Sequence, residues 1–383
     1  MRIAIVAETF LPTVNGVTGS VLRVLEHLER RGHEAIVVTA GPGPDHHGSV
    51  PVVRTPSMPL PFYRGIPMAL PTDRVAAALA AFRPDVVHLA APVALGAAGA
   101  HAAAAAGIPA VAVYQTDLAG FAGRYHAGVL RPLIWRWLRR IHDRCALTLA
   151  PSTMSVWQLR RHGIGPVACW ARGVDLERFD PRHRDEALRA DLAPDGEVIV
   201  GYVGRLAPEK CVGLLAHLDG LRGVQVVVVG EGPSRASLER ALPRVRFLGF
   251  REGAELSAAM ASLDVFVHGG AHETFCQAVQ EALASGVPVV APAAGGPVDL
   301  VRHGENGWLF PPDDAALLRP MVSTLVAEPR LRAAMAARAR ASVAHRSWAV
   351  LGDELLDHYA AVTGRRAGDV RPVRPLRVVG DAA

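Results

Sequence analysis

The sequence lacks the patterns that mark several common kinds of site. Its four cysteines, Cys145, Cys169, Cys211 and Cys276, form no CxxC pair, so neither a zinc ribbon nor a disulfide framework is indicated. It contains no HExxH motif, no GxxxxGK[ST] phosphate-binding loop and no D-x-D motif. We therefore expect no P-loop nucleotide site and no bound metal, since no acidic pair is offered to hold Mg²⁺.

Long hydrophobic runs are also missing. The most apolar long segment, 89–114, is interrupted by Pro92, His101 and Pro109, and it fits a strand, a helix and a strand better than a membrane span. The opening residues, MRIAIVAETF, are too short an apolar run for the core of a signal peptide and fit a buried strand. A reducing cytosol is the simplest setting, so we expect a cytoplasmic protein.

The sequence does contain enough apolar material for a large core. Its 383 residues are 50% hydrophobic and 20% charged, which favours two or three domains. The net charge is +5, and arginine supplies nearly all of the positive charge. This excess suits an anionic ligand or an anionic membrane surface, and it equally suits an arginine-rich proteome. We expect no nucleic-acid partner.

Short runs rich in β-branched residues recur along the chain, with helix-length segments between them. Several are apolar throughout, such as VQVVVVG, which is typical of strands buried on both faces of a parallel sheet. The alternation predicts an α/β protein with doubly wound parallel sheets. The expected strands are 2–7, 34–39, 50–55, 85–90, 109–115, 147–151, 167–170, 197–203, 224–229, 245–250, 264–268, 287–291 and 307–310.

The strand pattern restarts once, after a segment rich in charges and turn residues. We therefore predict two Rossmann-like halves that face a cleft. The expected divisions are a first domain 1–170, a linker 171–196, a second domain 197–346, a helix 347–364 that packs back toward the first domain, and a disordered tail 365–383.

Two glutamates stand out in the stretch HETFCQAVQEALASGVPVVAP, 272–292. Glu273 and Glu281 are eight residues apart, about 12 Å along a helix, which is too far to share a proton but suits the two ends of an extended ligand. The N–H groups around Thr274, Phe275 and Cys276 are expected in the first helical turn, where they favour an anion such as phosphate. The alternative is a helix whose glutamates complement its dipole and face water.

Two cations follow the first strand of the second half, in YVGRLAPEK at 202–210. Open α/β sheets bind ligands at the carboxyl ends of their strands, where the fork of Arg205 and the point charge of Lys210 suit a diphosphate. An ordinary charged loop is the alternative. In the first half, Gly16 and Gly19 would let a loop backbone approach a ligand, although a turn that needs glycine is the commoner explanation.

The segment RPLIWRWLRRIHDR, 131–144, combines apolar side chains with arginines. One interpretation is a helix on an anionic membrane surface, and the other is a core helix with a solvated basic face. The apolar side is expected to consist of Leu133, Ile134, Trp137, Leu138 and Ile141.

These motifs together resemble the retaining GT-B glycosyltransferases of family four. The resemblance covers about residues 2–362, and the start of the chain, with YQTDLAGF and HETFCQ, is most similar to the GDP-mannose-dependent α-mannosyltransferases of actinobacteria, which act on membrane glycolipids. The matching motifs are GRLAPEK at 204–210, VVGEGPSR at 228–235, DVFVHGG at 264–270, E-x7-E at 273–281 and SGVPVVAPAAGGPVDLV at 285–301.

The resemblance implies a GT-B fold, a nucleotide-sugar co-substrate without a cofactor, and metal-independent transfer of a hexose with retention. Arg205 and Lys210 would bind the donor diphosphate and stabilise the charge of the leaving nucleotide. Glu281 would hold the ribose hydroxyls, and Glu273 would hold hydroxyls of the hexose. The acceptor would be lipid-linked or a small molecule, and a lipid-linked acceptor would place this cytoplasmic enzyme at the inner face of the membrane.

The resemblance also assigns smaller roles in donor binding and reveals departures. Gly16 would let a first-domain loop reach the diphosphate, Phe250 would border the base, and the N–H groups of Phe275 and Cys276 would touch sugar or phosphate. The family often has glycine where this chain has Thr274 and Cys276. Many members have a histidine near the anomeric carbon where this chain has Gln115, which cannot act as an acid or base. Asp117 is nearby and is a second candidate there.

Three other functions fit parts of the sequence. One is a glycosyltransferase that uses a UDP-sugar on a small-molecule or natural-product acceptor. Another is an NAD-dependent oxidoreductase, because VVVVGEGPSR offers G-x-G after a strand and Glu252 follows about twenty residues on, although the third glycine of the dinucleotide motif is missing. The last is a nucleotide-sugar binding protein without turnover.

Overall fold

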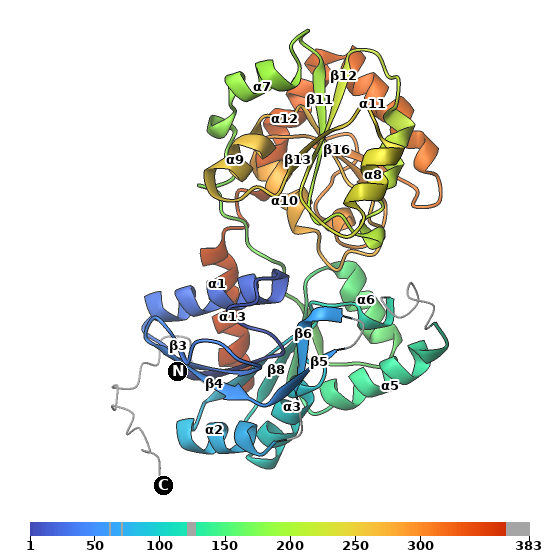
Figure 1. Ribbon diagram of the computed structural model, residues 1–383. Coiled ribbons are helices and arrows are strands. Elements are labelled where there is room, and N and C mark those ends of the chain that lie inside the picture. The colour runs from blue at the N-terminus through green and yellow to red at the C-terminus, as the bar shows by residue number, and fades with distance from the viewer. Residues whose placement is uncertain (61–62, 70–71, 121–127, 365–383) are drawn as a thin grey trace. The chain divides into compact units, whose positions relative to one another are not determined.

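The computed structural model describes residues 1–60, 63–69, 72–120 and 128–364 (Figure 1). The chain forms two compact units. The first consists of Met1–Val113, Ile141–Leu147 and the chain from Gly352 onward, and the second of Tyr114–Arg140 and Thr148–Leu351. The expected tail, 365–383, lies outside the described residues.

The first unit is built on a sheet whose strands run in the order β8-β7-β1-β2-β4-β3. All of these pairings are parallel except that of β3 with β4. Strand β1 lies in the middle, with Ile3 opposite Ala35 of β2 and Val86 of β7. The strands are β1 (Arg2–Ala7), β2 (Glu34–Ala40), β3 (His46–His47), β4 (Val50–Thr55), β7 (Val86–Ala90) and β8 (Ala110–Val113), and β5 (Ser57–Leu60) and β6 (Tyr63–Ala69) form a separate antiparallel hairpin.

Helices cover both faces of this sheet. Alternate strand residues such as Val6 and Leu89 pack in one core with α2 (Arg74–Phe82) and α3 (Leu95–Ala105). His88 points to the opposite face, where its Nδ1 lies 2.6 Å from the hydroxyl of Tyr359 in α13 (Trp348–Thr363). Beside α13 lies α1 (Gly16–Arg30), whose His27 Nε2 is 2.9 Å from Asp353 Oδ1. Side chains that alternate between two apolar faces explain why these strands read as continuous hydrophobic runs.

The second unit contains a parallel sheet in the order β13-β12-β11-β14-β15-β16. Here β11 is central, with Gly201 opposite Val227 of β12 and Phe266 of β14. The strands are β11 (Val198–Val203), β12 (Val224–Val229), β13 (Arg246–Gly249), β14 (Val265–Val267), β15 (Val289–Pro292) and β16 (Gly307–Phe310). A further parallel pair is formed by β9 (Leu147–Ala150) and β10 (Val167–Cys169).

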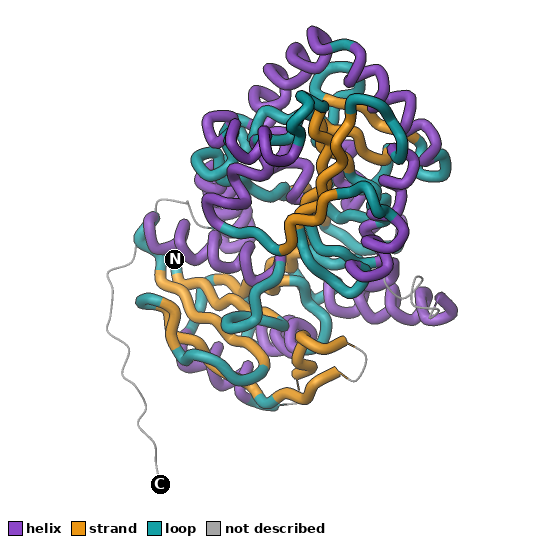
Figure 2. Tube along the Cα trace, turned by 45° about the horizontal axis from the view of Figure 1, so that its top comes forward, coloured by secondary structure: helices purple, strands orange, loops and turns teal. Residues whose placement is uncertain are grey.

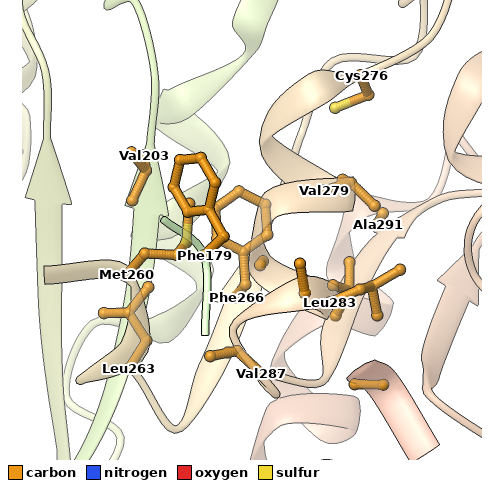
Figure 3. Close-up of a cluster of buried hydrophobic side chains, with 14 of the residues drawn as sticks. Phe179, Val203, Met260, Leu263, Phe266, Cys276, Val279, Leu283, Val287 and Ala291 are labelled. Carbon is orange, nitrogen blue, oxygen red and sulfur yellow. The ribbon is translucent and has the colours of Figure 1, made fainter. Parts of the chain in front are cut away.

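Two apolar cores fill the two faces of the six-stranded sheet. In one, Val203 and Phe266 pack with Val279 and Leu283 of α10 (Gln277–Ala284), as Figure 3 shows. In the other, Val200 and the alternate residues of the neighbouring strands pack against η4 (Val212–Leu218), α8 (Arg235–Ala241) and α11 (Leu318–Ala327). Helices accordingly lie on both sides of the strands within the unit, as Figure 2 shows.

The remaining elements of the second unit are helices and single helical turns. They are η1 (Gly128–Leu130), α5 (Arg131–His142), α6 (Thr153–Arg161), η2 (Pro181–His183), α7 (Glu186–Leu192), η3 (Pro208–Lys210), η4 (Val212–Leu218), α8 (Arg235–Ala241), α9 (Gly253–Ala261), α10 (Gln277–Ala284), η5 (Gly296–Asp299), η6 (Ala315–Leu317), α11 (Leu318–Ala327) and α12 (Pro329–Val343).

The prediction of doubly wound parallel sheets is confirmed. Every expected strand overlaps an observed one, and the ends differ by two residues at most. The sequence analysis missed β3, β5 and β6, which are short or rich in proline. The expected linker, 171–196, contains η2 and α7, and the expected last helix coincides with α13. Within the described residues, no helix combines the length and the apolar character needed to cross a bilayer.

Candidate active site

Two loops at the carboxyl ends of neighbouring strands bring Lys210 and Glu273 together. Lys210 ends η3, which follows β11, and Glu273 lies in the loop after β14. Because β11 and β14 are parallel neighbours, both loops leave the same edge of the sheet, where α/β proteins bind ligands. Lys210 Nζ donates a hydrogen bond of 2.5 Å to Glu273 Oε1. The two side chains are 26% and 17% exposed, so a ligand can still reach them.

Both members of this ion pair are held in their charged forms. Burial alone would raise the pKa of Glu273, but His268 and Lys210 lower it to about 2. Burial alone would lower the pKa of Lys210, but Glu273 raises it above its ordinary value. The pair therefore persists across neutral pH, and each partner offsets the cost of burying the other charge.

His268 lies beside the Lys210–Glu273 ion pair. It follows β14, is 2% exposed, and places Nε2 at 3.4 Å from Glu273 Oε1. Its ring stacks on Tyr202, with the centroids 6.2 Å apart. Burial would lower the pKa of His268, whereas Cys276 and Glu273 raise it to about 10. Neither ring nitrogen completes a hydrogen bond with another residue in the part of the chain that the structure describes.

The helix that carries Glu281 begins later than the sequence suggests. Cys276 is its N-cap and adopts a left-handed conformation with φ of 78°, and α10 starts at Gln277. Thr274 and Phe275 thus precede the cap, and the expectation that their N–H groups belong to the first turn is wrong. The left-handed backbone is the physical reason, because a residue with positive φ interrupts the helical run.

A pair of glycines holds the Glu273 loop in place. Gly296 N donates a hydrogen bond of 2.8 Å to Glu273 O. A Cβ atom on Gly296 would lie 1.7 Å from Phe275 O, and one on Gly295 would lie 2.4 Å from Glu273 O. The segment after β15 therefore approaches the Glu273 loop so closely that side chains are excluded at both positions, which fixes the carboxylate relative to Lys210.

Glu281 lies on the partly buried side of α10, little more than one turn from its start. Burial raises the pKa of Glu281 to about 7, although Arg178, Gln277 and Arg172 act to lower it. The helix is also attached to the segment that contains Arg172 and Arg178, because Gln277 Nε2 donates a hydrogen bond of 3.0 Å to Gly173 O. The alternative in which both glutamates of the motif sit on a solvated helix face is wrong, because Glu273 and Glu281 are both partly buried.

The two uncertain candidates from the YQTD segment lie beside this loop. Thr274 Oγ1 donates a hydrogen bond of 3.1 Å to Gln115 O. The side-chain amide of Gln115 is buried and has no hydrogen-bond partner among the described residues. Asp117 accepts hydrogen bonds from Gly120 N at 2.8 Å and from the hydroxyl of Tyr114 at 3.2 Å.

A cavity of about 980 Å³ opens in front of Glu273. Asp117 and Glu273 both line it, together with Thr274 and, from α6, Trp157 and Arg161. This volume is in the range of small-molecule sites. The cavity lining does not include Arg205, Lys210, Phe250 or Glu281, as far as the described residues go, so the predicted donor residues are not gathered in one pocket.

Three other residues were predicted to bind the donor, namely Arg205, Phe250 and Gly16. Arg205 follows β11 and its side chain is exposed, while its carbonyl accepts a hydrogen bond from the Tyr202 hydroxyl. Phe250, after β13, is 64% exposed. Gly16 starts α1 in the first unit, next to Asn15, whose side chain caps the helix.

Helix α5 has two distinct faces, which differ from the expected ones. Trp135, Leu138 and Ile141 are buried, whereas Leu133 and Trp137 are 52% and 45% exposed. Leu133 and Trp137 were both expected on the same side as Leu138 and Ile141. That placement is wrong for both residues, because Trp135 occupies the inner face.

The G-x-G at Gly230 and Gly232 is explained by packing between loops. Gly230 has φ of 136°, and a Cβ there would lie 2.0 Å from Gly204 O. A Cβ on Gly232 would lie 2.2 Å from Leu206 O. Glu252, the proposed ribose acid of a dinucleotide site, is the N-cap residue of α9. These glycines let the loop after β12 lie against the loop after β11. This packing explains both glycines without a bound dinucleotide.

Comparisons with known proteins identify the family to which the chain belongs. The family model for Glycosyltransferase Family 4 matches residues 14–178, and the model for Glycosyl transferases group 1 matches residues 183–342. A GDP-mannose-dependent alpha-mannosyltransferase of Mycobacterium tuberculosis is 51% identical over 372 residues, which cover 96% of this chain and 98% of that protein. A protein of the same description from Corynebacterium glutamicum is 46% identical and covers 94% and 89% of the two chains.

Solved structures show the same architecture. The HepE protein of Anabaena in complex with UDP has a TM-score of 0.77 at 22% identity, with 94% of this chain and 100% of that one covered. The family matches favour a glycosyltransferase over the dehydrogenase and the non-catalytic binder. The chain therefore belongs to the family 4 glycosyltransferases, with a group 1 glycosyltransferase domain in its second half and the GT-B fold.

Proposed function

We propose that this protein transfers mannose from GDP-mannose to a lipid-linked acceptor, with retention of the anomeric configuration. The names of the relatives from two actinobacteria support the donor and the sugar. The observation that carries the proposal is the Lys210–Glu273 ion pair, because it sets a cation for the diphosphate beside a carboxylate for the sugar.

In this proposal the donor replaces part of the ion pair. The phosphates take the charge of Lys210 and the fork of Arg205, and the hexose hydroxyls donate to Glu273 in place of the lysine. Glu281 accepts from the ribose hydroxyls, and Phe250 borders the base. Donor contacts are completed by Thr274, by the N–H groups of Phe275 and Cys276, and by the loop at Gly16.

The chemistry proposed is a same-face displacement at the anomeric carbon. The bond from that carbon to the diphosphate oxygen breaks, the acceptor oxygen bonds to the same face, and the acceptor proton passes to the departing phosphate. Lys210 and Arg205 stabilise the charge that develops on the nucleotide, so no bound metal is needed. Gln115 and Asp117 position the acceptor hydroxyl from the side of the cavity that Glu273 lines.

A lipid-linked acceptor is supported by the exposed face of α5. Leu133 and Trp137 are exposed there, next to the exposed Arg136 and Arg140, and η1 adds Val129, which is 90% exposed. Tryptophan and aliphatic side chains among arginines suit the interface of an anionic membrane. The protein then works as a peripheral enzyme at that surface.

The test is a donor screen against lipid extract from an actinobacterium. With GDP-mannose, mass spectrometry should show one added hexose on a glycolipid, and NMR of the product should show an α linkage. The yield should not change when EDTA is added. Transfer from UDP-glucose but not from GDP-mannose, or a β-linked product, would contradict the proposal.

A further inference from the structure

Beside the ion pair, three side chains of different chemistry converge. His268, Glu273 and Cys276 each offer one metal-ligating atom, and these atoms all lie within 4.8 Å of one another. They come from the end of β14, from the loop after it, and from the N-cap of α10. Imidazole, carboxylate and thiolate are the three side-chain ligands that Zn²⁺ takes most often.

His268 supplies an independent indication of a ligand. The residue is 2% exposed, and neither ring nitrogen completes a hydrogen bond among the described residues, although Nε2 lies 3.4 Å from Glu273 Oε1. Buried polar groups are rarely left without a hydrogen bond, and here only the nearby charge offsets part of the lost hydration. A Cβ on Gly270 would lie 2.9 Å from His268 Nε2 and 3.1 Å from Glu273 Oε1, so glycine keeps the space between them clear.

The separations suit a four-coordinate metal. Bonds of about 2.0–2.3 Å in a tetrahedron place ligand atoms about 3.3–3.8 Å apart. The distance from His268 Nε2 to Glu273 Oε1, 3.4 Å, falls in this range. The third ligand, Cys276 Sγ, needs to close in by about 1 Å at most, within the reach of one side-chain rotation.

We propose that His268, Glu273 and Cys276 bind one borderline-soft divalent cation such as Zn²⁺, and that this ion inhibits the enzyme. Three protein ligands leave the fourth position for water or solvent from the cavity that Glu273 lines. Binding of the metal is independent of the function proposed above, whereas inhibition rests on it, because the metal occupies the carboxylate assigned to the sugar.

The ion must compete with Lys210 for Glu273. Lys210 Nζ donates to Glu273 Oε1, and its side chain is 26% exposed, so it can turn outward when the metal takes the carboxylate. Loss of the lysine should therefore strengthen metal binding while it weakens donor binding. Metal binding also releases protons from the thiol and the imidazole, so the affinity should rise with pH.

The experiment uses Co²⁺ and Zn²⁺ salts alone, with the full chain. Co²⁺ should give a thiolate-to-metal charge-transfer absorption band at one equivalent, and Zn²⁺ should remove it. Cys276→Ser should abolish the band, and His268→Gln should weaken Co²⁺ binding by about 10–100-fold. Cys169→Ser, at an exposed cysteine on β10, is the matched control and should keep the band. Lys210→Gln should strengthen binding by about tenfold.

Two outcomes overturn the proposal. One is a band that is missing in the wild-type protein, and the other is a band that persists in Cys276→Ser. Thermal shifts with GDP identify variants that have failed to fold, and His268→Gln provides a second test that leaves the thiol intact. In the transfer assay, Zn²⁺ should inhibit competitively with GDP-mannose and EDTA should restore the rate. A band without inhibition would keep the site and contradict the sugar-binding role of Glu273, so the two failures are distinguishable.

Discussion

At the scale of single residues, the candidate site depends on one lysine. Lys210 is the only lysine in the sequence, among 41 cationic residues counted as lysine and arginine, and it is paired with Glu273 at 2.5 Å. A compact ammonium can leave one acceptor for another more easily than a bidentate guanidinium can. In the proposed reaction the same charge stabilises Glu273 before the donor arrives and the phosphates afterwards, a role that favours lysine in a chain that otherwise uses arginine.

Replacing Glu273 should separate binding from turnover. Glu273→Ala removes the proposed hydroxyl acceptor but leaves Lys210 to the phosphates, so we expect transfer to fall by about 10³-fold while the affinity for GDP changes by a few-fold. Transfer is measured with GDP-mannose and lipid, and GDP affinity by calorimetry. Glu273→Gln controls for the loss of volume. Turnover close to wild type in either variant would contradict the role at the sugar.

Lys210 is the only side-chain amine that acetylation can modify, because the chain contains no other lysine. Acetylation removes the charge that the diphosphate is proposed to use, so activity should fall by about 10²-fold as acetylation proceeds. Peptide mass spectrometry measures modification at Lys210, and saturating GDP should slow it. Equal rates of modification with and without GDP would show that the nucleotide does not cover this amine.

The pH dependence of donor binding should report on Glu281. Its pKa is raised to about 7 by burial, against the influence of Arg178, Gln277 and Arg172, while Asp175 adds to the increase. As an acceptor for ribose hydroxyls the carboxylate must be ionised, so the KM for the donor should rise about tenfold as the pH falls from 8 to 6. Glu281→Gln should have a weaker affinity at pH 8 and a flat profile. A wild-type profile that is flat over this interval would argue against Glu281 as the ribose ligand.

At the scale of elements, the geometry of the site depends on a loop of small residues. The segment after β15 lies against the Glu273 loop, and a methyl group on Gly296 would overlap Phe275 O at 1.7 Å. Gly296→Ala should cost about 2–3 kcal/mol of unfolding free energy because the backbone must shift. The shift also moves Glu273, so transfer should fall more than stability alone explains. The matched control is Gly213→Ala, where a Cβ meets nothing within 4 Å.

Urea denaturation measures the stability of both glycine variants. Gly213→Ala should unfold within about 0.5 kcal/mol of the wild type. If Gly296→Ala proved as stable as Gly213→Ala, the close approach of the two loops would be wrong.

The sequence predicts an element well when neighbouring residues determine that element, and poorly when distant residues do. Apolar runs such as 224–229 located strands because burial on both faces leaves a direct pattern. The predicted start of α10 was wrong because Cys276 has a left-handed backbone conformation, which a cysteine in the sequence does not indicate. The pairing of Lys210 with Glu273 joins residues 63 positions apart, and only the order of the strands brings them together.

At the scale of the whole molecule, the two units carry different titrating groups. Burial lowers the pKa of His88 and His142 to about 4, and burial together with the charged N-terminus does the same for His33. All three belong to the first unit. The second unit holds Glu281, whose pKa is raised to about 7. The second unit also contains every tryptophan of the chain, namely Trp135, Trp137, Trp157, Trp170, Trp308 and Trp348.

These differences predict that acid unfolds the first unit before the second. A histidine whose folded pKa is lowered contributes stability that is present above the unfolded value of about 6.5 and is lost as the pH falls toward 4, at about 1.4 kcal/mol per pH unit for each group. Glu281 has the opposite sign, since its contribution is complete below its ordinary pKa of 4.5 and is lost as the pH rises from there through about 7. As the pH falls from 6.5 to 4.5, the first unit therefore loses stability. Glu281 causes no loss of stability in the second unit over this interval.

The order of unfolding can be read from two signals in one acid titration, because tryptophan fluorescence reports only on the second unit. Far-UV circular dichroism should begin to fall at a higher pH than the fluorescence, and His142→Gln should move this first step to lower pH by removing one of the protons taken up on unfolding. The fluorescence step should stay where it is in that variant, since the substitution lies in the other unit. Coincident transitions that both move with His142→Gln would mean that the two units unfold as one, and the separate acid sensitivity of the first unit would have to be abandoned.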